Sequence, residues 1–120
     1  MLTLLTNAYS GGSRNLAAIR QQVPEHSNGR LAYTSAFGDF FLFYFKRTSD
    51  RYDICIERQR DYGGRDTDSQ PTHRLGLDYN RPRICIQPGK EPRDLPTAIL
   101  VAMVWAERTS RYIRDGLPWT

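Results

Sequence analysis

The chain has 120 residues, a net charge of +4, 39% hydrophobic residues and 25% charged residues. This length is typical of one folding unit, so we expect a single domain over residues 1–120 with one hydrophobic core. Its two cysteines are too few for a disulfide scaffold, and the longest apolar run, nine residues over 98–106, is shorter than the roughly 20 residues of a membrane-spanning helix. The N-terminus lacks the basic stretch of a secretory signal, so we expect a cytoplasmic protein that does not enter membranes.

The basic residues are strongly biased, with fifteen arginines and two lysines. The planar guanidinium group suits phosphate, carboxylate and aromatic partners better than the compact ammonium of lysine. A GC-rich genome produces the same bias without any function attached, and we favour that interpretation of the bias itself.

The first predicted element is a short helix that starts after Ser13, a suitable N-cap. Leu16, Ile19 and Val23 recur at i, i+3 and i+7, which is the helical period. Pro24 ends the helix, because proline lacks the amide donor and clashes with the preceding turn.

From Arg30 onward the apolar period changes to two, which predicts β-strands. The first strand covers residues 30–37, and the following Gly38–Asp39 pair suits a two-residue hairpin whose first position needs a positive φ. The second strand, Phe40–Phe45 (FFLFYF), is apolar at every position, so we expect it to be central and covered on both faces. A third strand over residues 52–57 alternates apolar and polar side chains.

The segment Arg60–Thr72 is rich in glycine, aspartate and serine, so we expect a mobile loop. Two short strands follow, around residues 75–79 and 84–86. The last element is a helix over residues 95–115, with Asp94 as its N-cap and Gly116 as its stop.

The first half of this last helix is apolar all round, so we expect it to be buried, and three arginines occupy its last turns: Arg108, Arg111 and Arg114. In chain order the elements predict an α+β fold. It consists of an N-terminal helix, an antiparallel meander of about five strands, and a C-terminal amphipathic helix packed on one face of the sheet.

Cys85 is the strongest candidate for chemistry, because it precedes a Pro-Gly loop and follows Arg83, and a cationic neighbour favours the nucleophilic thiolate. Ile84 and Ile86 should face the core and leave the thiol on the opposite side. We favour a structural role, since cysteine is commonly buried as a small hydrophobe.

The other residues that carry chemistry give weaker signals. Cys55 lies between Asp53 and Glu57 on its strand face, which discourages a thiolate, and we expect both cysteines to be free. His26 and His73 lie beside turns without converging ligands, so we predict no metal site, although His73 could serve Cys85 as a general base. No nucleotide-binding or hydrolase motif is present, so the sequence predicts no catalytic residue and no cofactor.

The C-terminal third, RICIQPGKEPRDLPTAILVAMVWAERTSRYIRDGLPW, resembles bacterial E2-like proteins, which are relatives of ubiquitin-conjugating enzymes. Those proteins place a cysteine on a strand, then a Pro/Gly loop, then a tryptophan-bearing helix; the matching positions are Cys85, Pro88, Gly89, Trp105, Gly116 and Trp119. The resemblance implies that Cys85 forms a thioester. The chain departs from the pattern because no His-Pro-Asn precedes that cysteine, which leaves no residue to stabilise the oxyanion.

The sequence favours a small non-enzymatic protein that docks on another macromolecule, in the first place a protein. Arginine and aromatic side chains are enriched at such interfaces, and we expect contacts from Arg108, Arg111, Arg114, Trp119, Tyr62, Lys90 and Arg93. The alternatives are a nucleic-acid-binding protein that uses the arginine surface and an E2-like transfer protein that uses Cys85. The sequence does not predict an oligomeric state.

Overall fold

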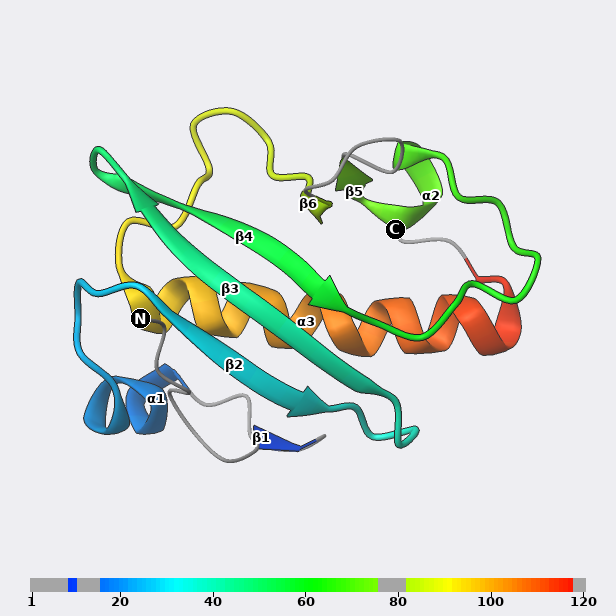
Figure 1. The fold of residues 1–120 in the computed structure, drawn as a ribbon, viewed down its shortest axis with the longest axis horizontal. Coiled ribbons are helices and arrows are strands. Elements are labelled where there is room, and N and C mark those ends of the chain that lie inside the picture. The colour runs from blue at the N-terminus through cyan, green and yellow to red at the C-terminus, as the bar shows by residue number, and fades with distance from the viewer. Residues whose placement is uncertain (1–8, 11–15, 76–81, 118–120) are drawn as a thin grey trace.

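In a computed structural model of the protein, the described parts of the chain are residues 9–10, 16–75 and 82–117 (Figure 1). The elements in chain order are β1 (Tyr9–Ser10), α1 (Leu16–Gln22), β2 (Gly29–Thr34), β3 (Phe40–Thr48), β4 (Arg51–Arg58), α2 (Ser69–Thr72), β5 (Arg74–Leu75), β6 (Arg83–Ile84) and α3 (Leu95–Asp115). The radius of gyration of 13.5 Å agrees with the roughly 14 Å of a compact domain of this length.

The sheet confirms the predicted α+β class, with the strand order β1-β2-β3-β4-β6-β5. β2, β3, β4, β6 and β5 pair antiparallel, while β1, which was not predicted, pairs parallel with β2. The order of the last two strands differs from a simple meander, because β6 lies between β4 and β5. The amide of Ile56 donates to the Pro82 carbonyl at 2.8 Å, so the chain before β6 joins β4 directly. The predicted fourth strand continues into residues that lie outside the described ones.

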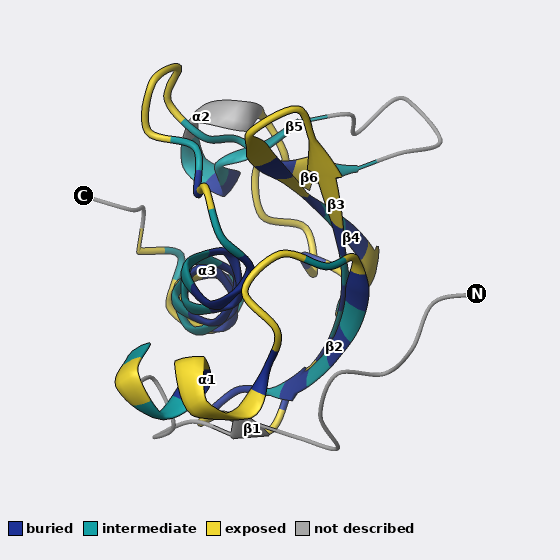
Figure 2. Cartoon of the chain, turned by 90° about the vertical axis from the view of Figure 1, so that its left-hand side faces the viewer, coloured by how far each residue is buried: buried dark blue, intermediate teal, exposed yellow. Residues whose placement is uncertain are grey.

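The helices α1 and α3 lie on the concave side of the curved sheet (Figure 2). Phe41, Phe43 and Phe45 of β3 point to this side and are fully buried. Phe40, the first residue of β3, points to the other side and is 48% exposed, and no described helix covers that side. The expectation that β3 is covered on both faces is therefore wrong, although β3 is central in the sheet.

Trp105 of α3 ties the helix to both the sheet and α2. Its indole packs edge-on against Phe41 and Phe43, with ring centroids 6.0 Å away in each case. Its Nε1 donates to the carbonyls of Thr72 and His73 at 3.1 and 3.2 Å. A buried indole needs such an acceptor, so the short helix α2 is held by a contact more than 30 residues distant in sequence.

The hairpin between β2 and β3 has a three-residue loop instead of the predicted two-residue turn. The amide of Gly38 donates to the Ser35 carbonyl and the amide of Ser35 to the Asp39 carbonyl, both at 2.9 Å. Gly38 has the predicted positive φ, 90°. The longer loop follows from burial of Ser35, whose hydroxyl accepts from the Asp39 amide at 3.1 Å and from the hydroxyl of Ser110 on α3 at 2.8 Å.

Both ends of α3 are where the sequence predicts them. The Asp94 carboxylate accepts from the Thr97 amide at 2.8 Å, and Gly116 has a φ of 69° while its amide donates to the Tyr112 carbonyl at 2.8 Å. The expected burial of the first half all round is wrong, since Leu100, Val101 and Val104 remain half-exposed. The sheet covers only one side of the helix (Figure 2), and these three side chains line a groove beside β6.

Candidate functional site

The residues predicted to make contacts do not form one surface. Arg93 precedes α3 and pairs with Asp50 at 3.1 Å, and Lys90 is exposed in the turn before it. Arg111 lies near the opposite end of α3, and a helix of 21 residues spans about 30 Å. Trp119 lies outside the described residues. A single docking surface cannot include both ends of the helix unless it runs its whole length.

Arg114, which was predicted to contact a partner, is engaged in contacts within the chain. Its Nη2 donates to the Phe37 carbonyl at 3.0 Å and to Asp39 Oδ1 at 3.3 Å, and its guanidinium lies 5.1 Å from the Phe37 ring centroid. These contacts hold the β2–β3 hairpin against the end of α3.

Tyr62 is buried, not exposed on a mobile loop as predicted. Only 5% of it is accessible, and its ring packs edge-on against Tyr112 of α3 with centroids 6.1 Å apart. The Tyr112 hydroxyl donates to the Asp66 carbonyl at 2.8 Å, and Arg65 donates to the carbonyls of residues 113 and 114 at the end of α3. This anchoring could not be predicted from the sequence, because Tyr62 is a single aromatic residue in a segment of mostly polar residues.

The face of the sheet opposite α3 carries a second group of basic and aromatic side chains, none of which was predicted to make contacts. Cross-strand pairing places Arg30, Tyr44, Cys55 and Arg83 in one row across β2, β3, β4 and β6. A neighbouring row contains Ala32, Leu42 and Arg58. We call this surface the open face, and its members are Arg30, Ala32, Thr34, Phe40, Leu42, Tyr44, Lys46, Asp53, Cys55, Glu57, Arg58 and Arg83.

An irregularity in the β3–β4 pairing shapes the open face. Phe43 pairs with Ile56 and Leu42 pairs with Arg58, so Glu57 is an extra residue on β4. Such a bulge changes the direction in which the neighbouring side chains point. Glu57 accepts from Arg30 at 2.7 and 3.1 Å, and the two side chains bridge across β3.

The charges of the open face favour an acidic partner. The open face carries four basic residues (Arg30, Lys46, Arg58 and Arg83) and two acidic residues (Asp53 and Glu57), which leaves an excess of two positive charges.

At the centre of the open face, burial and the nearby Asp53 carboxylate raise the pKa of the Cys55 thiol. The predicted discouragement of a thiolate at Cys55 is therefore confirmed.

The two cysteines are free thiols, as predicted. Cys85 lines a groove of about 340 Å³ between β6 and α3, together with both of its isoleucine neighbours. This groove is lined by Ile84, Cys85, Ile86, Gln87, Leu100, Val101, Val104 and Trp105. Strand pairing ends at Ile84, so the alternation that predicted the orientation of Cys85 does not reach it.

His73 and Cys85 are joined through their backbones, because the Cys85 amide donates to the His73 carbonyl at 2.8 Å. Burial and the cationic Arg108 lower the pKa of the His73 imidazole, which favours its neutral form. Among the described residues no group of three or more metal-ligating side chains converges, and no helix is long and apolar enough to cross a membrane.

Comparisons with known proteins indicate no function for this chain, so a function can be argued only from its geometry. No protein-family model matches the chain, and no curated protein or solved structure is significantly similar to it.

Proposed function

We propose that this chain is a non-enzymatic binding protein that docks on another protein through the open face of its sheet. One observation supports the proposal above all. The central strand β3 presents Phe40, Leu42 and Tyr44 on the side that no described helix covers, and Phe40 is 48% exposed. Apolar side chains on a solvent-facing sheet cost solubility, so their clustering on one face is typical of an interaction surface.

The composition of the open face favours a partner with complementary apolar and acidic groups. Aromatic and arginine side chains supply most of the energetic anchors of protein interfaces, and here arginines lie on both flanks of the β3 side chains. Arg58 and Arg83 lie on the β4 and β6 side, and Arg30 lies on the β2 side, partly neutralised by Glu57. A complementary partner has an apolar centre for Phe40 and Leu42 and carboxylates around it.

The test is site-specific photocrosslinking followed by binding measurements. The full chain with a photoreactive phenylalanine analogue in place of Phe40 is irradiated in its native host, and the crosslinked protein is identified, purified and titrated. We expect Phe40→Ser to weaken its binding at least about tenfold, because a buried aromatic anchor is removed.

Leu117 supplies the matched control, because it is 45% exposed and lies beyond the end of α3, away from the open face. The analogue at position 117 should not crosslink the same protein, and Leu117→Ser should bind it with unchanged affinity. Equal binding by the Phe40→Ser and native chains, with both folded, would overturn the proposal.

A single-stranded nucleic acid is the second candidate. Phe40 and Tyr44 lie on the same sheet face as four cations, and sheets of this kind can stack bases on aromatic rings. Fluorescence anisotropy with a generic oligonucleotide separates the candidates. Affinity that falls steeply with salt and is lost in Phe40→Ser supports a nucleic-acid partner, and absence of binding at low salt excludes it.

A further inference from the structure

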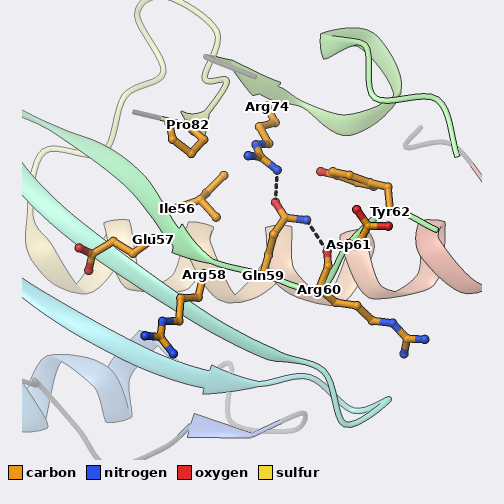
Figure 3. A pocket seen from close by; sticks show the side chains of 9 residues that line it. All are labelled: Ile56, Glu57, Arg58, Gln59, Arg60, Asp61, Tyr62, Arg74 and Pro82. Atoms are coloured by element: carbon orange, nitrogen blue, oxygen red, sulfur yellow. Dashed lines mark hydrogen bonds between the residues drawn. The ribbon is translucent and has the colours of Figure 1, made fainter. Parts of the chain in front are cut away.

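A second hollow lies at the end of β4, and Arg74 of β5 and Pro82 also line it (Figure 3). It has a volume of about 490 Å³, within the range of sites that hold small organic ligands. Its lining comprises Ile56, Glu57, Arg58, Gln59, Arg60, Asp61, Tyr62, Arg74 and Pro82. Of these nine residues, only Tyr62 was predicted from the sequence to make contacts, as part of a mobile loop.

Two hydrogen-bond donors of this hollow are buried without a partner among the described residues. They are the Tyr62 hydroxyl and Arg74 Nε. The Arg74 guanidinium lies 6.0 Å from the Tyr62 ring centroid, and the Tyr62 hydroxyl end is directed toward Arg74 in Figure 3. A buried polar group without a partner costs about 1–3 kcal/mol, so two such donors in one hollow indicate a missing acceptor.

The neighbouring contacts fix the orientation of Arg74. Its Nη1 donates to Gln59 Oε1 at 2.6 Å, and Gln59 Nε2 donates to the Arg60 carbonyl at 3.0 Å. One nitrogen of the guanidinium, Nη1, is thus fixed by a hydrogen bond, while Nε has no hydrogen-bond partner among the described residues. This arrangement preorganises a donor for a ligand and reduces the entropy that binding costs.

The charged residues of the lining carry a small excess of positive charge, because Arg58, Arg60 and Arg74 outnumber Glu57 and Asp61. Glu57 is paired with Arg30 at 2.7 Å, and Asp61 accepts from the Gly63 amide at 2.9 Å. Arg60 is in turn paired with Asp39 at 3.1 Å. Apart from these two ion pairs, the lining keeps two cations, Arg58 and Arg74, and one carboxylate, Asp61, whose charge the amide hydrogen bond does not remove.

We propose that this hollow binds the oxyanion group of a small organic acid, either a carboxylate or a phosphate ester. The oxyanion accepts from the Tyr62 hydroxyl and Arg74 Nε, since charge-assisted hydrogen bonds to a guanidinium are the strongest such contacts. The apolar part of the ligand packs on Ile56 and Pro82, which line the same hollow. The hollow shares Glu57 and Arg58 with the open face, but its two unpartnered donors belong to Tyr62 and Arg74, so anion binding does not depend on protein docking.

NMR titration of the ¹⁵N-labelled chain tests the proposal with benzoate, phenyl phosphate and benzamide. Benzamide has the shape of benzoate without the charge. We expect saturable shifts of the Gln59, Tyr62 and Arg74 amides with at least one of the two anions, at a concentration about fivefold or more below that needed for benzamide. A response to benzoate but not phenyl phosphate assigns a carboxylate ligand, and the reverse assigns a phosphate ester.

Tyr62→Phe is the decisive variant, because it removes the hydroxyl and leaves the ring that packs on Tyr112. Without a ligand it should melt at or above the native temperature, since an unpartnered hydroxyl is lost. Its affinity for the bound anion should fall about fivefold or more, while Tyr44→Phe on the open face should bind as the native chain does. Unchanged affinity in folded Tyr62→Phe, or no saturable shifts with either anion, overturns the proposal.

Discussion

At the scale of single residues, the unpartnered buried atoms are the most informative feature. Among the described residues they occur at Asp39, Tyr62, Arg74 and Thr109, and two of these four lie in the same hollow. The Asp39 atom has a local explanation, since its other carboxylate oxygen accepts from Arg60 and Arg114. Arg74 is likewise bonded through its Nη1 to Gln59, so Tyr62 and Arg74 are distinguished by the position of their unpartnered donors in one hollow.

The Cys55 thiol should react with an alkylating reagent more slowly than a thiol in an unstructured peptide does. In the Cys85→Ser variant only Cys55 remains, and burial and the Asp53 carboxylate raise its pKa. We expect a thiol reagent such as iodoacetamide to modify it about tenfold or more slowly than glutathione at pH 8, and to accelerate as the pH rises. A rate equal to that of glutathione in the folded variant would contradict this expectation.

The reciprocal variant, Cys55→Ser, isolates Cys85 and examines the E2-like resemblance, which stays a prediction. A thioester function requires a thiol-labile adduct on Cys85 that Cys85→Ser abolishes and Cys55→Ser preserves. The apolar groove around Cys85 favours burial of a small hydrophobe instead.

At the scale of elements, α3 was predictable to the residue because its boundaries depend on local signals. Asp94 caps its first turn and Gly116 takes the left-handed conformation at its end. In contrast, α2 has four residues and is held by the Trp105 indole. No local pattern specifies an element whose stability comes from a distant side chain.

Asp94→Ala should destabilise the protein by about 1 kcal/mol, because the cap on the Thr97 amide is lost. Burial opposes ionisation of Asp94, but hydrogen bonds from Thr97 and Arg20 outweigh it and lower the pKa of the carboxyl. The ionised cap therefore stabilises the fold above the unfolded pKa of about 3.9, and this contribution is lost as the pH falls through the lower folded value.

Chemical denaturation at pH 7 and near pH 2 measures the effect of Asp94→Ala. The difference in unfolding free energy from the native chain should be present at pH 7 and smaller at the lower pH. Asp94→Ser keeps a capping oxygen and should recover most of the loss at pH 7. A Ser variant as unstable as the Ala variant would show that the cap is not the cause.

At the scale of the whole molecule, the alternation in β2 and β4 made the fold class predictable from sequence. The strand order was not, because β5 and β6 have two residues each and pair through long-range contacts. The open face was missed for a different reason. Phe40–Phe45 is apolar at every position, and such a run does not reveal whether one side of the strand or both are covered.

The same architecture predicts unequal local stability. β3 is paired on both sides and packs against Trp105, whereas β5 is an edge strand of two residues. Regions with few buried apolar contacts open without global unfolding. By hydrogen exchange we expect the amides of β3 and of the middle of α3 to exchange about 100-fold or more slowly than those of β5 and β6. Equal protection of β5 and β3 would mean that the sheet opens only as a single unit, and that the edge carrying Arg74 is as rigid as the core beneath the open face.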